Sequence, residues 1–268
     1  MLPILFHWGP ITLYTYGFLL VLGFLAAVGW TQRHARREGI SPEQITDAGL
    51  WMLLVGVVCA RLVFVALEHD HYTSWTQIFQ VWQGGLSLHG GLLGGVLAGA
   101  WYCRSQGIPF LKMADVVAPS LGLGYAFGRM GCLLNGCCYG TECHLPWAMR
   151  FPSVQVPGTL TPPSHPTQIY SALAGLLIWV LVERLSRRPH YRGQLFGTFL
   201  LLYSVYRFLV EALRKGVTAR VLVDGLTEGQ VASLVMFVVA LGLMAWWRRR
   251  SGAQELPAAA KAASGTRV

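Results

Sequence analysis

Charge is scarce in this 268-residue chain, and acidic residues are the scarcer sign. Charged residues make up 12% of the sequence against 54% hydrophobic residues, and 12 Asp and Glu oppose 21 Lys and Arg. An ordinary soluble domain has about twice that share of charge, so the composition excludes a typical soluble fold and favours a membrane protein. The net charge of +9 does not indicate a nucleic-acid partner, because the basic residues stand in short clusters between apolar runs.

Other features are missing as well. The chain has no tandem repeat and no paired Cys-x-x-Cys units, and no Lys or Arg precedes Trp8. The last absence argues against a cleavable signal peptide, which begins with a positively charged region. The first apolar run ends instead at the cluster Arg33, Arg36 and Arg37, which is typical of a signal anchor that stays in the membrane.

Apolar runs long enough to cross ~30 Å of hydrocarbon recur along the chain. They predict an all-α integral membrane domain over residues 1–250, a bundle of about seven transmembrane helices. The predicted spans are 11–30, 47–67, 87–103, 114–134, 168–185, 194–211 and 229–247. The remaining segment, 251–268, is rich in Ala, Gly, Pro and Ser and is expected to be a disordered, non-catalytic cytoplasmic tail.

The basic residues that flank these spans predict the orientation, because Lys and Arg are retained on the cytoplasmic side. One side has twelve: Arg33, Arg36, Arg37, Arg104, Lys112, Arg184, Arg187, Arg188, Arg192, Arg248, Arg249 and Arg250. The other side has four: Arg150, Arg214, Lys215 and Arg220. We therefore expect the N-terminus outside, the C-terminus in the cytoplasm, and an external cap segment at about 135–167 with six prolines.

Three arginines, Arg61, Arg129 and Arg207, lie inside the apolar runs. An arginine at mid-membrane costs roughly 2.5–3.5 kcal/mol even on insertion-based scales, so each needs compensation. Snorkelling or a structural ion pair is one source of compensation, and a bound anion is another. With the expected orientation, these arginines share the outer half of the bilayer with Tyr16 and His89, and the five residues come from five spans.

The sixth span contains a polar stripe. Tyr203, Arg207, Glu211 and Arg214 are separated by four, four and three residues, so one helical face would carry them. Glu211 is expected to pair with both stripe arginines. A closed salt-bridge network is the structural alternative, but it leaves Arg129 and one stripe arginine without a counter-ion. A phosphate would supply that charge, so the pattern predicts a site for an anionic lipid headgroup.

Glycines surround His89 and Arg129. They are Gly84, Gly85, Gly90, Gly91, Gly94, Gly95 and Gly99 around His89, and Gly122, Gly124, Gly128 and Gly131 around Arg129. Close helix packing explains most of them, and some positions would give backbone room for a headgroup. Because His89 directly precedes a Gly-Gly pair, we expect it to open a helix that lines a cavity and to have a functional role.

Five segments in order, from about residue 9 to 247, together resemble the prolipoprotein diacylglyceryl transferase family. They are Gly9-Pro10 with Tyr16-Gly17, residues 82–94 around His89-Gly90-Gly91, residues 128–136 from Gly128-Arg129 to Asn135-Gly136, the run His165-Pro166-Thr167-Gln168-Ile169-Tyr170, and Tyr203 through Arg207 and Glu211 to Arg214. Any one segment would be weak evidence, whereas the ordered set is specific.

The resemblance implies a multi-pass enzyme of the bacterial inner (cytoplasmic) membrane that performs the first step of lipoprotein maturation. Such an enzyme transfers the diacylglyceryl group of phosphatidylglycerol to the lipobox cysteine thiol of a prolipoprotein, forming a thioether and releasing glycerol 1-phosphate. The expected partners are phosphatidylglycerol and prolipoprotein signal peptides with a lipobox cysteine, and not nucleic acid. No cofactor and no metal are expected, and the protein is expected to be a monomer.

The resemblance also implies the site residues. The expected catalytic group is His89, Arg129, Tyr203, Arg207 and Glu211: the arginines hold the phosphate and stabilise its developing charge, Glu211 orients Arg207, and His89 takes the thiol proton. Tyr203 is expected to position the headgroup together with Tyr16. The remaining substrate-binding candidates are Arg61, Gly90, Gly91, Asn135, His165, Gln168, Tyr170 and Arg214.

The chain departs from the family pattern at three places. Many members carry Asn where this chain has Cys132, Glu where it has the pair Cys137-Cys138, and Glu where it has Ser171. With Cys143 and His144 nearby, the cysteines allow three interpretations. A metal site is the first, although no paired Cys-x-x-Cys units are present. A disulfide from Cys143 to Cys137 or Cys138 in an oxidising compartment is the second, and free thiols in the core are the third.

Two other functions remain compatible with the sequence. A non-enzymatic anionic-lipid-binding protein or transporter would use the same cationic site. A transporter needs polar features that reach both membrane faces, however, and the cytoplasmic half offers mainly flanking Arg and Asp115. A divergent transferase with another acceptor is the second alternative.

Overall fold

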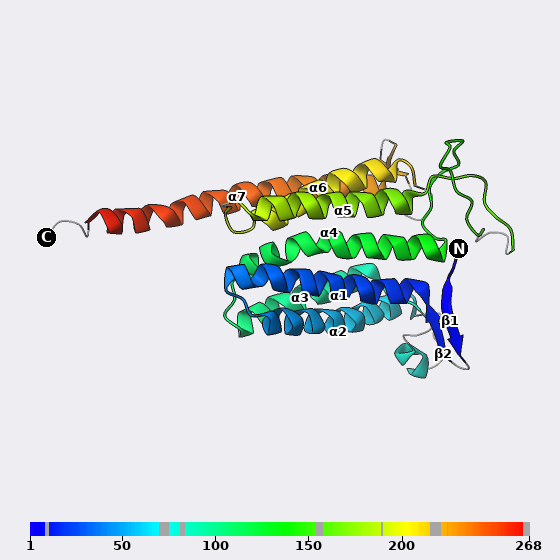
Figure 1. The fold of residues 1–268 in the computed structure, drawn as a ribbon, viewed down its shortest axis with the longest axis horizontal. Helices are drawn as coiled ribbons and strands as arrows, with labels where there is room; N and C mark the ends of the chain where they lie inside the picture. The colour runs from blue at the N-terminus through cyan, green and yellow to red at the C-terminus, as the bar shows by residue number, and fades with distance from the viewer. Residues whose placement is uncertain are drawn as a thin grey trace. The chain divides into compact units, whose positions relative to one another are not determined.

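The computed structural model describes residues 1–8, 11–69, 75–80, 84–153, 158–188, 190–214, 221–223 and 225–264. These residues are mostly helical (Figure 1). The helices described are α1 (Thr15–Ala35), α2 (Pro42–Leu67), α3 (Leu88–Ser105), α4 (Phe110–Asn135), α5 (Thr167–Ser186), α6 (Gln194–Glu211) and α7 (Glu228–Ser264), with the short 3-10 turns η1 (Arg36–Glu38) and η3 (Trp75–Phe79). Each predicted span therefore overlaps one helix, although several helices extend beyond the predicted bounds.

Two short antiparallel hairpins accompany the helices, and the sequence analysis did not predict them. They pair β1 (Ile4–Trp8) with β2 (Ile11–Tyr14), and β3 (Val221–Val223) with β4 (Leu226–Thr227). Residues 11–14, which we expected to begin the first span, are thus a strand. Helix α1 begins only at Thr15, whose hydroxyl donates to Leu2 O at 2.5 Å and whose N–H donates to Pro3 O at 3.0 Å. The Gly9-Pro10 motif lies outside the described residues.

Among the described residues, four helical segments are long and apolar enough to cross a membrane: Thr15–Glu38, Pro42–Leu67, Thr167–Ser186 and Glu228–Arg250. The chain is therefore a multi-pass membrane protein. Helices α3, α4 and α6 match the other predicted spans, but glycine, tyrosine and arginine lower their hydropathy. The count of seven crossings and the disorder expected for 251–268 stay predictions.

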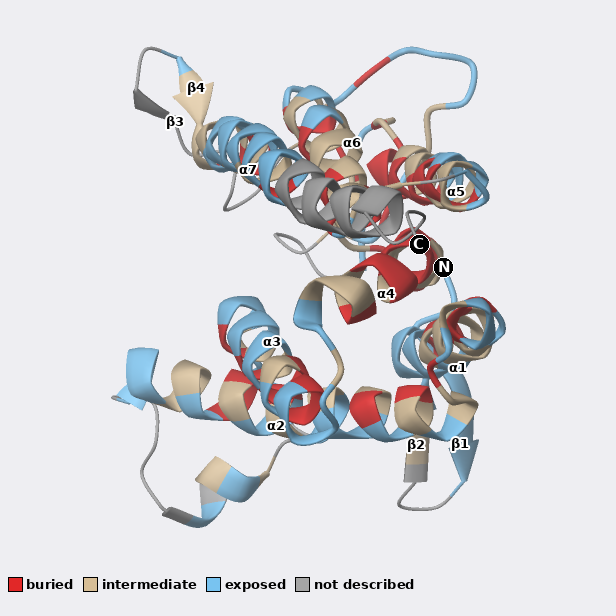
Figure 2. Ribbon diagram, turned by 90° about the vertical axis from the view of Figure 1, so that its left-hand side faces the viewer, coloured by how far each residue is buried: buried red, intermediate tan, exposed pale blue. Residues whose placement is uncertain are grey.

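Apolar side chains cover much of the protein surface. In Figure 2 the exposed parts of the helices are pale blue. On α2, Leu54, Val58 and Leu62 follow one another at four-residue spacing and are 60%, 56% and 56% exposed. On α5, Leu173 and Leu177 are 60% and 59% exposed. Stripes of this size are typical of helices whose outer faces contact lipid tails, because water would penalise them.

The chain divides into two compact units, residues 30–113 and residues 1–29 with 114–268. In the unit of residues 30–113, α2 and α3 pack closely because α3 presents glycines to α2. A Cβ added at Gly90 would lie 2.5 Å from Cys59 O, and one added at Gly91 would lie 3.5 Å from the Ala60 Cβ. The packing interpretation therefore accounts for the absence of a side chain at Gly90.

In the other unit, α6 packs against both α5 and α7 (Figure 1). Helices α4 and α5 also approach closely, since a Cβ at Gly122 would lie 2.7 Å from Gly175 O. The buried Asp115 of α4 accepts hydrogen bonds from Gly193 N–H at 2.5 Å and Phe196 N–H at 2.9 Å, so this acid caps the first turn of α6. This capping explains why Asp115 is buried, so its burial does not require a role in transport.

The described parts of the segment between α4 and α5 are held by isolated β-bridges. These join Glu142 and Met149 to Ser164, Pro152 to Leu160, and Gly140 to Arg214 at the end of α6. The segment is therefore folded onto the ends of α5 and α6. Its location outside the membrane stays a prediction.

Candidate active site

Arg129 lies in α4, one helical turn after Tyr125. Its guanidinium carbon is 4.9 Å from the centre of the Tyr125 ring, a cation–π contact. Among the described residues it has no acidic partner. A half-buried arginine that has no carboxylate partner in the described part of the chain is well suited to bind an anion.

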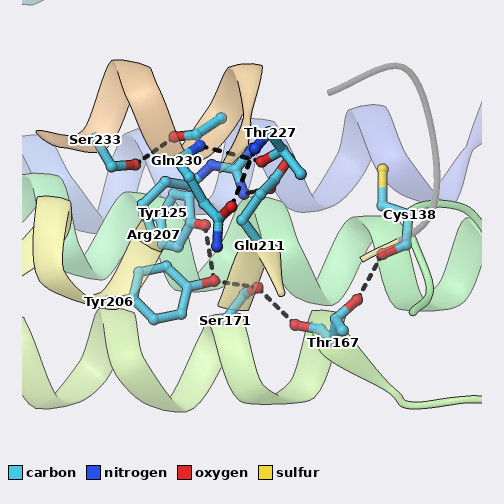
Figure 3. A network of polar contacts seen from close by, with 11 residues as sticks. Tyr125, Cys138, Thr167, Ser171, Tyr206, Arg207, Glu211, Thr227, Gln230 and Ser233 are labelled. Carbon is cyan, nitrogen blue, oxygen red and sulfur yellow. Dashed lines mark hydrogen bonds and ion pairs between the residues drawn. The ribbon is translucent and has the colours of Figure 1, made fainter. Parts of the chain in front are cut away.

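Arg207 and Glu211 form an ion pair one turn apart on α6 (Figure 3). Arg207 Nη1 donates to Glu211 Oε2, and the two side chains are 13% and 0% exposed. Helix α7 closes over the carboxylate, because a Cβ added at Gly229 would lie 2.5 Å from Glu211 Oε1. In the part of the chain that the structure describes, Glu211 Oε1 has no hydrogen-bond partner, so the carboxylate pairs with a single arginine there.

Arg214 does not join this pair, and the expected contact between Glu211 and Arg214 is absent among the described residues. The physical reason is that α6 ends at Glu211. The chain then turns, and Arg214 forms a backbone bridge with Gly140 instead of continuing the helical stripe. The buried Nε of Arg214 has no hydrogen-bond partner among the residues that the structure describes. Glu211 therefore pairs with Arg207 alone, and two of the predicted site arginines, Arg129 and Arg214, have no ion-paired carboxylate in the described part of the chain.

Tyrosine rings lie close to Arg129 and Arg207. Tyr203 meets Tyr125 edge to face with ring centres 5.4 Å apart, and Tyr206 lies 6.1 Å from both rings. The Tyr203 hydroxyl lies within electrostatic range of both Arg129 and Arg207. The tyrosine rings thus connect Arg129 of α4 with Arg207 of α6.

The hydroxyl groups beside them form a directed chain (Figure 3). Ser171 Oγ donates to Thr167 O at 2.6 Å, so it accepts the proton of the Tyr206 hydroxyl. The Tyr125 and Tyr206 hydroxyls are 3.2 Å apart, and because the Tyr206 proton is already used, Tyr125 must donate. Ser171, where the family pattern has Glu, therefore anchors the tyrosine pair.

Three predicted residues at or just before the start of α5 contact the segment that precedes that helix. Gln168 Nε2 donates to Cys137 O at 2.7 Å, and the Gln168 side chain is fully buried. His165 Nδ1 lies 3.4 Å from the Tyr170 hydroxyl, which also accepts from Trp147 Nε1 at 2.7 Å. These contacts join the cap segment to α5. They support a positioning role for His165, Gln168 and Tyr170.

Tyr16 and Asn135 lie near the end of α4. A Cβ at Gly131 would be 3.0 Å from Tyr16 Cδ2, so α1 meets α4 two residues beyond Arg129. Asn135 is the exposed last residue of α4 and lies beside the Cys137 thiol. Both predicted residues thus belong to the same unit as Arg129.

All six cysteines are free thiols, so neither predicted disulfide of Cys143 is formed. The Sγ atoms of Cys132, Cys137 and Cys138 lie within 4.8 Å of one another, and Cys143 is not part of this cluster. Hydrogen bonds from the Cys132 and Cys137 thiols, together with the charges of Arg129 and Arg214, lower the pKa of the Cys138 thiol from its ordinary value, although burial opposes the shift.

The unit of residues 30–113 contains Arg61, His89, Gly90 and Gly91. Arg61 is buried and binds backbone carbonyls: Nε donates to Ile78 O at 2.8 Å, and Nη1 donates to Gly84 O at 2.6 Å and Gly85 O at 3.0 Å. His89 is exposed in the first turn of α3, which Ser87 caps by accepting from Gly90 N–H at 3.4 Å. His89 makes no hydrogen bond or ion pair with any other described residue.

Sequence reasoning missed Tyr125, Tyr206 and Ser171. One signal could have identified Tyr125, because it stands four residues before Arg129 and a helix places such residues on one face. The same spacing does not single out Tyr206, which follows Tyr203 by three residues among many apolar neighbours. Its hydroxyl acquires a role only through its contacts with α4 and α5.

Comparisons with known proteins place nearly the whole chain in one family. The family model described as prolipoprotein diacylglyceryl transferase matches residues 3–246. A protein of Thermosynechococcus vestitus named phosphatidylglycerol–prolipoprotein diacylglyceryl transferase is 37% identical over 93% of this chain and 93% of its own length. Proteins of the same name from Geobacillus kaustophilus and Vibrio vulnificus are each 36% identical, over 91% and 94% of both chains respectively.

Proposed function

The chain belongs to the prolipoprotein diacylglyceryl transferase family, and from this membership we propose that it transfers the diacylglyceryl group of phosphatidylglycerol to the lipobox cysteine thiol of a prolipoprotein. It is a membrane transferase of lipoprotein maturation, which sets aside the transporter and the purely lipid-binding alternative. The proposed acceptor is the signal peptide of the prolipoprotein, and the products are a thioether and glycerol 1-phosphate.

The chemistry determines which groups the site needs. The thiol loses its proton, and the sulfur attacks the glyceryl carbon that bears the phosphate. The carbon–oxygen bond breaks, and its electron pair remains on the phosphate oxygen. A phosphodiester with one negative charge becomes a monoester with a second, so cations placed at that oxygen lower the barrier.

The observation that carries the proposal is Arg129, a guanidinium without an acidic partner among the described residues and seated on the Tyr125 ring. In our proposal it holds two oxygens of the headgroup phosphate with its planar fork of N–H donors. Arg207 contributes a second positive charge, and Glu211 fixes its orientation. Tyr203 and Tyr16 position the glycerol headgroup, and Arg214 adds positive potential.

We assign the thiol proton to His89, which is exposed at the start of α3. Neutral imidazole is a suitable acceptor near neutral pH. Arg61 acts as a positioning residue in this proposal, since its hydrogen bonds to Gly84 and Gly85 carbonyls fasten the turn that precedes Ser87 and His89. Gly90 and Gly91 allow the start of α3 to pack against α2.

We propose a monomer of the bacterial inner membrane with seven crossings, the N-terminus outside and the C-terminus in the cytoplasm. The basic flanks of the spans support this orientation. It would place the cap segment, Asn135, His165, Gln168 and Tyr170 on the external side, and the arginine site in the outer half of the bilayer.

The direct test incubates purified protein with phosphatidylglycerol and a lipobox peptide, and detects the lipidated peptide by mass spectrometry. Parallel reactions with phosphatidylethanolamine and with a peptide whose lipobox cysteine is serine test the donor and the acceptor. Lipidated peptide formed only in the complete reaction supports the proposal. A folded protein that binds phosphatidylglycerol but yields no thioether would contradict it.

Variants then test the phosphate clamp. We expect Arg129→Lys to lower the transfer rate ~100-fold, because an ammonium ion cannot hold two oxygens in the same plane. Arg150→Lys is the matched control, since Arg150 is an exposed arginine of the cap segment. A near-normal rate for Arg129→Lys at normal abundance would show that Arg129 is not the clamp.

A further inference from the structure

Three thiols gather at the end of α4 and have no role in the proposed reaction. The Sγ atoms of Cys132, Cys137 and Cys138 lie within 4.8 Å of one another and none is in a disulfide. Cys137 and Cys138 follow Cys132 by five and six positions, and the three sulfurs lie close together because the chain folds back on the end of α4. Cys137 N–H donates to Cys132 O at 3.1 Å, which closes this turn.

The backbone of the turn is held firmly by α5. Gln168 Nε2 donates to Cys137 O and Thr167 Oγ1 donates to Cys138 O, both at 2.7 Å. Cys138 has a φ of 64°, an uncommon conformation for a residue with a side chain. The turn is thus organised before any ligand arrives, as a binding site requires.

We propose that Cys132, Cys137 and Cys138 bind one thiophilic d10 metal ion, such as Zn²⁺ or Cu⁺, through their three sulfurs. Soft thiolate ligands select these ions over Mg²⁺ or Ca²⁺. With metal–sulfur bonds of ~2.3 Å, sulfurs in such a site lie roughly 3.8 Å apart. The cluster therefore needs to contract by only about 1 Å, which side-chain rotation about χ1 can supply.

A metal ion bound to the three cysteines would lie close to the arginine site. Cys132 follows Arg129 by three residues on α4, and Arg129 and Arg214 both act electrostatically on Cys138. Three thiolates with Zn²⁺ have a net charge of −1. This negative charge offsets the positive charge of the arginines that would otherwise attract a phosphate headgroup. Bound metal should therefore weaken binding of phosphatidylglycerol and inhibit transfer. This second statement rests on the proposed function, whereas metal binding itself does not.

The binding experiment uses reduced, metal-free full-length protein in detergent, with Zn²⁺ titrated against a chromophoric chelator. We expect one Zn²⁺ per chain. Cys132→Ala and Cys138→Gly should each raise the dissociation constant ~100-fold or more, because each removes one of three ligands. Glycine adopts a positive φ without strain, so we expect Cys138→Gly to keep the fold. Cys143→Ala is the matched control, since Cys132 and Cys143 are both 9% exposed.

A separate transfer assay follows the apparent KM for phosphatidylglycerol with and without Zn²⁺. We expect at least about a tenfold rise in KM for the parent protein and for Cys143→Ala, and none for Cys138→Gly. Zinc binding that survives in both cluster variants would overturn the site, as would a cluster disulfide in protein isolated without reductant. If the protein has no transferase activity, the chelator titration still decides the metal site on its own.

Discussion

Replacing Glu211 with Gln tests the most buried charge in the site. Glu211 is fully buried, its partner Arg207 is 13% exposed, and Gly229 of α7 packs against the carboxylate. Gln keeps the size of the side chain, so the change removes the charge without opening a cavity. Breaking a buried ion pair costs ~3–5 kcal/mol, and the partial exposure of Arg207 favours the lower end. We therefore expect the free energy of unfolding to fall by about 3 kcal/mol, or ~100-fold in the equilibrium constant.

The chain offers a matched control for this substitution. Glu183 and Arg187 form another pair at the same four-residue spacing, with side chains that are 10% and 64% exposed and a separation of 3.6 Å. Solvent screens the exposed arginine, so Glu183→Gln should cost no more than about 1 kcal/mol. Reversible unfolding in mixed SDS micelles, followed by tryptophan fluorescence, measures both variants against the parent protein.

The KM for phosphatidylglycerol distinguishes a role of Glu211 in orienting Arg207 from a role in folding alone. If Glu211 orients Arg207, the folded fraction of Glu211→Gln should show a raised KM for phosphatidylglycerol, with little dependence on pH, while Glu183→Gln keeps the parental KM. Equal stability losses in the two variants would refute the argument from burial. An unchanged KM in folded Glu211→Gln would refute the orienting role.

Three further predictions concern other parts of the chain. The rate deficit of His89→Asn should shrink as rising pH supplies thiolate without a base; a deficit that is constant between pH 6 and 9 would remove His89 as the proton acceptor. A variant with Cys132, Cys137, Cys138 and Cys143 all changed to Ser should keep transferring lipid, since the attacking thiol belongs to the substrate; inactivity of folded protein would contradict this. Cysteine labelling should find position 36 in the cytoplasm and position 155 outside, and labelling of position 155 from the cytoplasm would reverse the proposed orientation.

Local patterns predicted the helices well, because each apolar run must satisfy its own backbone hydrogen bonds in lipid and a helix does so without partners. They failed at residues 11–14, where the sequence Ile-Thr-Leu-Tyr fits a strand as well as a span. The hairpin with β1 decided the outcome, since Thr15 finds its hydrogen-bond partners in Leu2 and Pro3. That information lies in a pairing between two segments and not in either one.

The candidate site shows the same division. The cost of charge in an apolar run was enough to single out Arg129 and Arg207, and four-residue spacing on one helix was enough to pair Arg207 with Glu211. Only the tertiary structure decided that α6 ends before Arg214, and that Tyr206 reaches Ser171. It also decided that the Cys137-Cys138 pair folds back onto Cys132. The physical reason is that helix periodicity relates residues a turn apart, whereas a helix end, a contact between helices and a folded-back turn depend on which distant segments pack there.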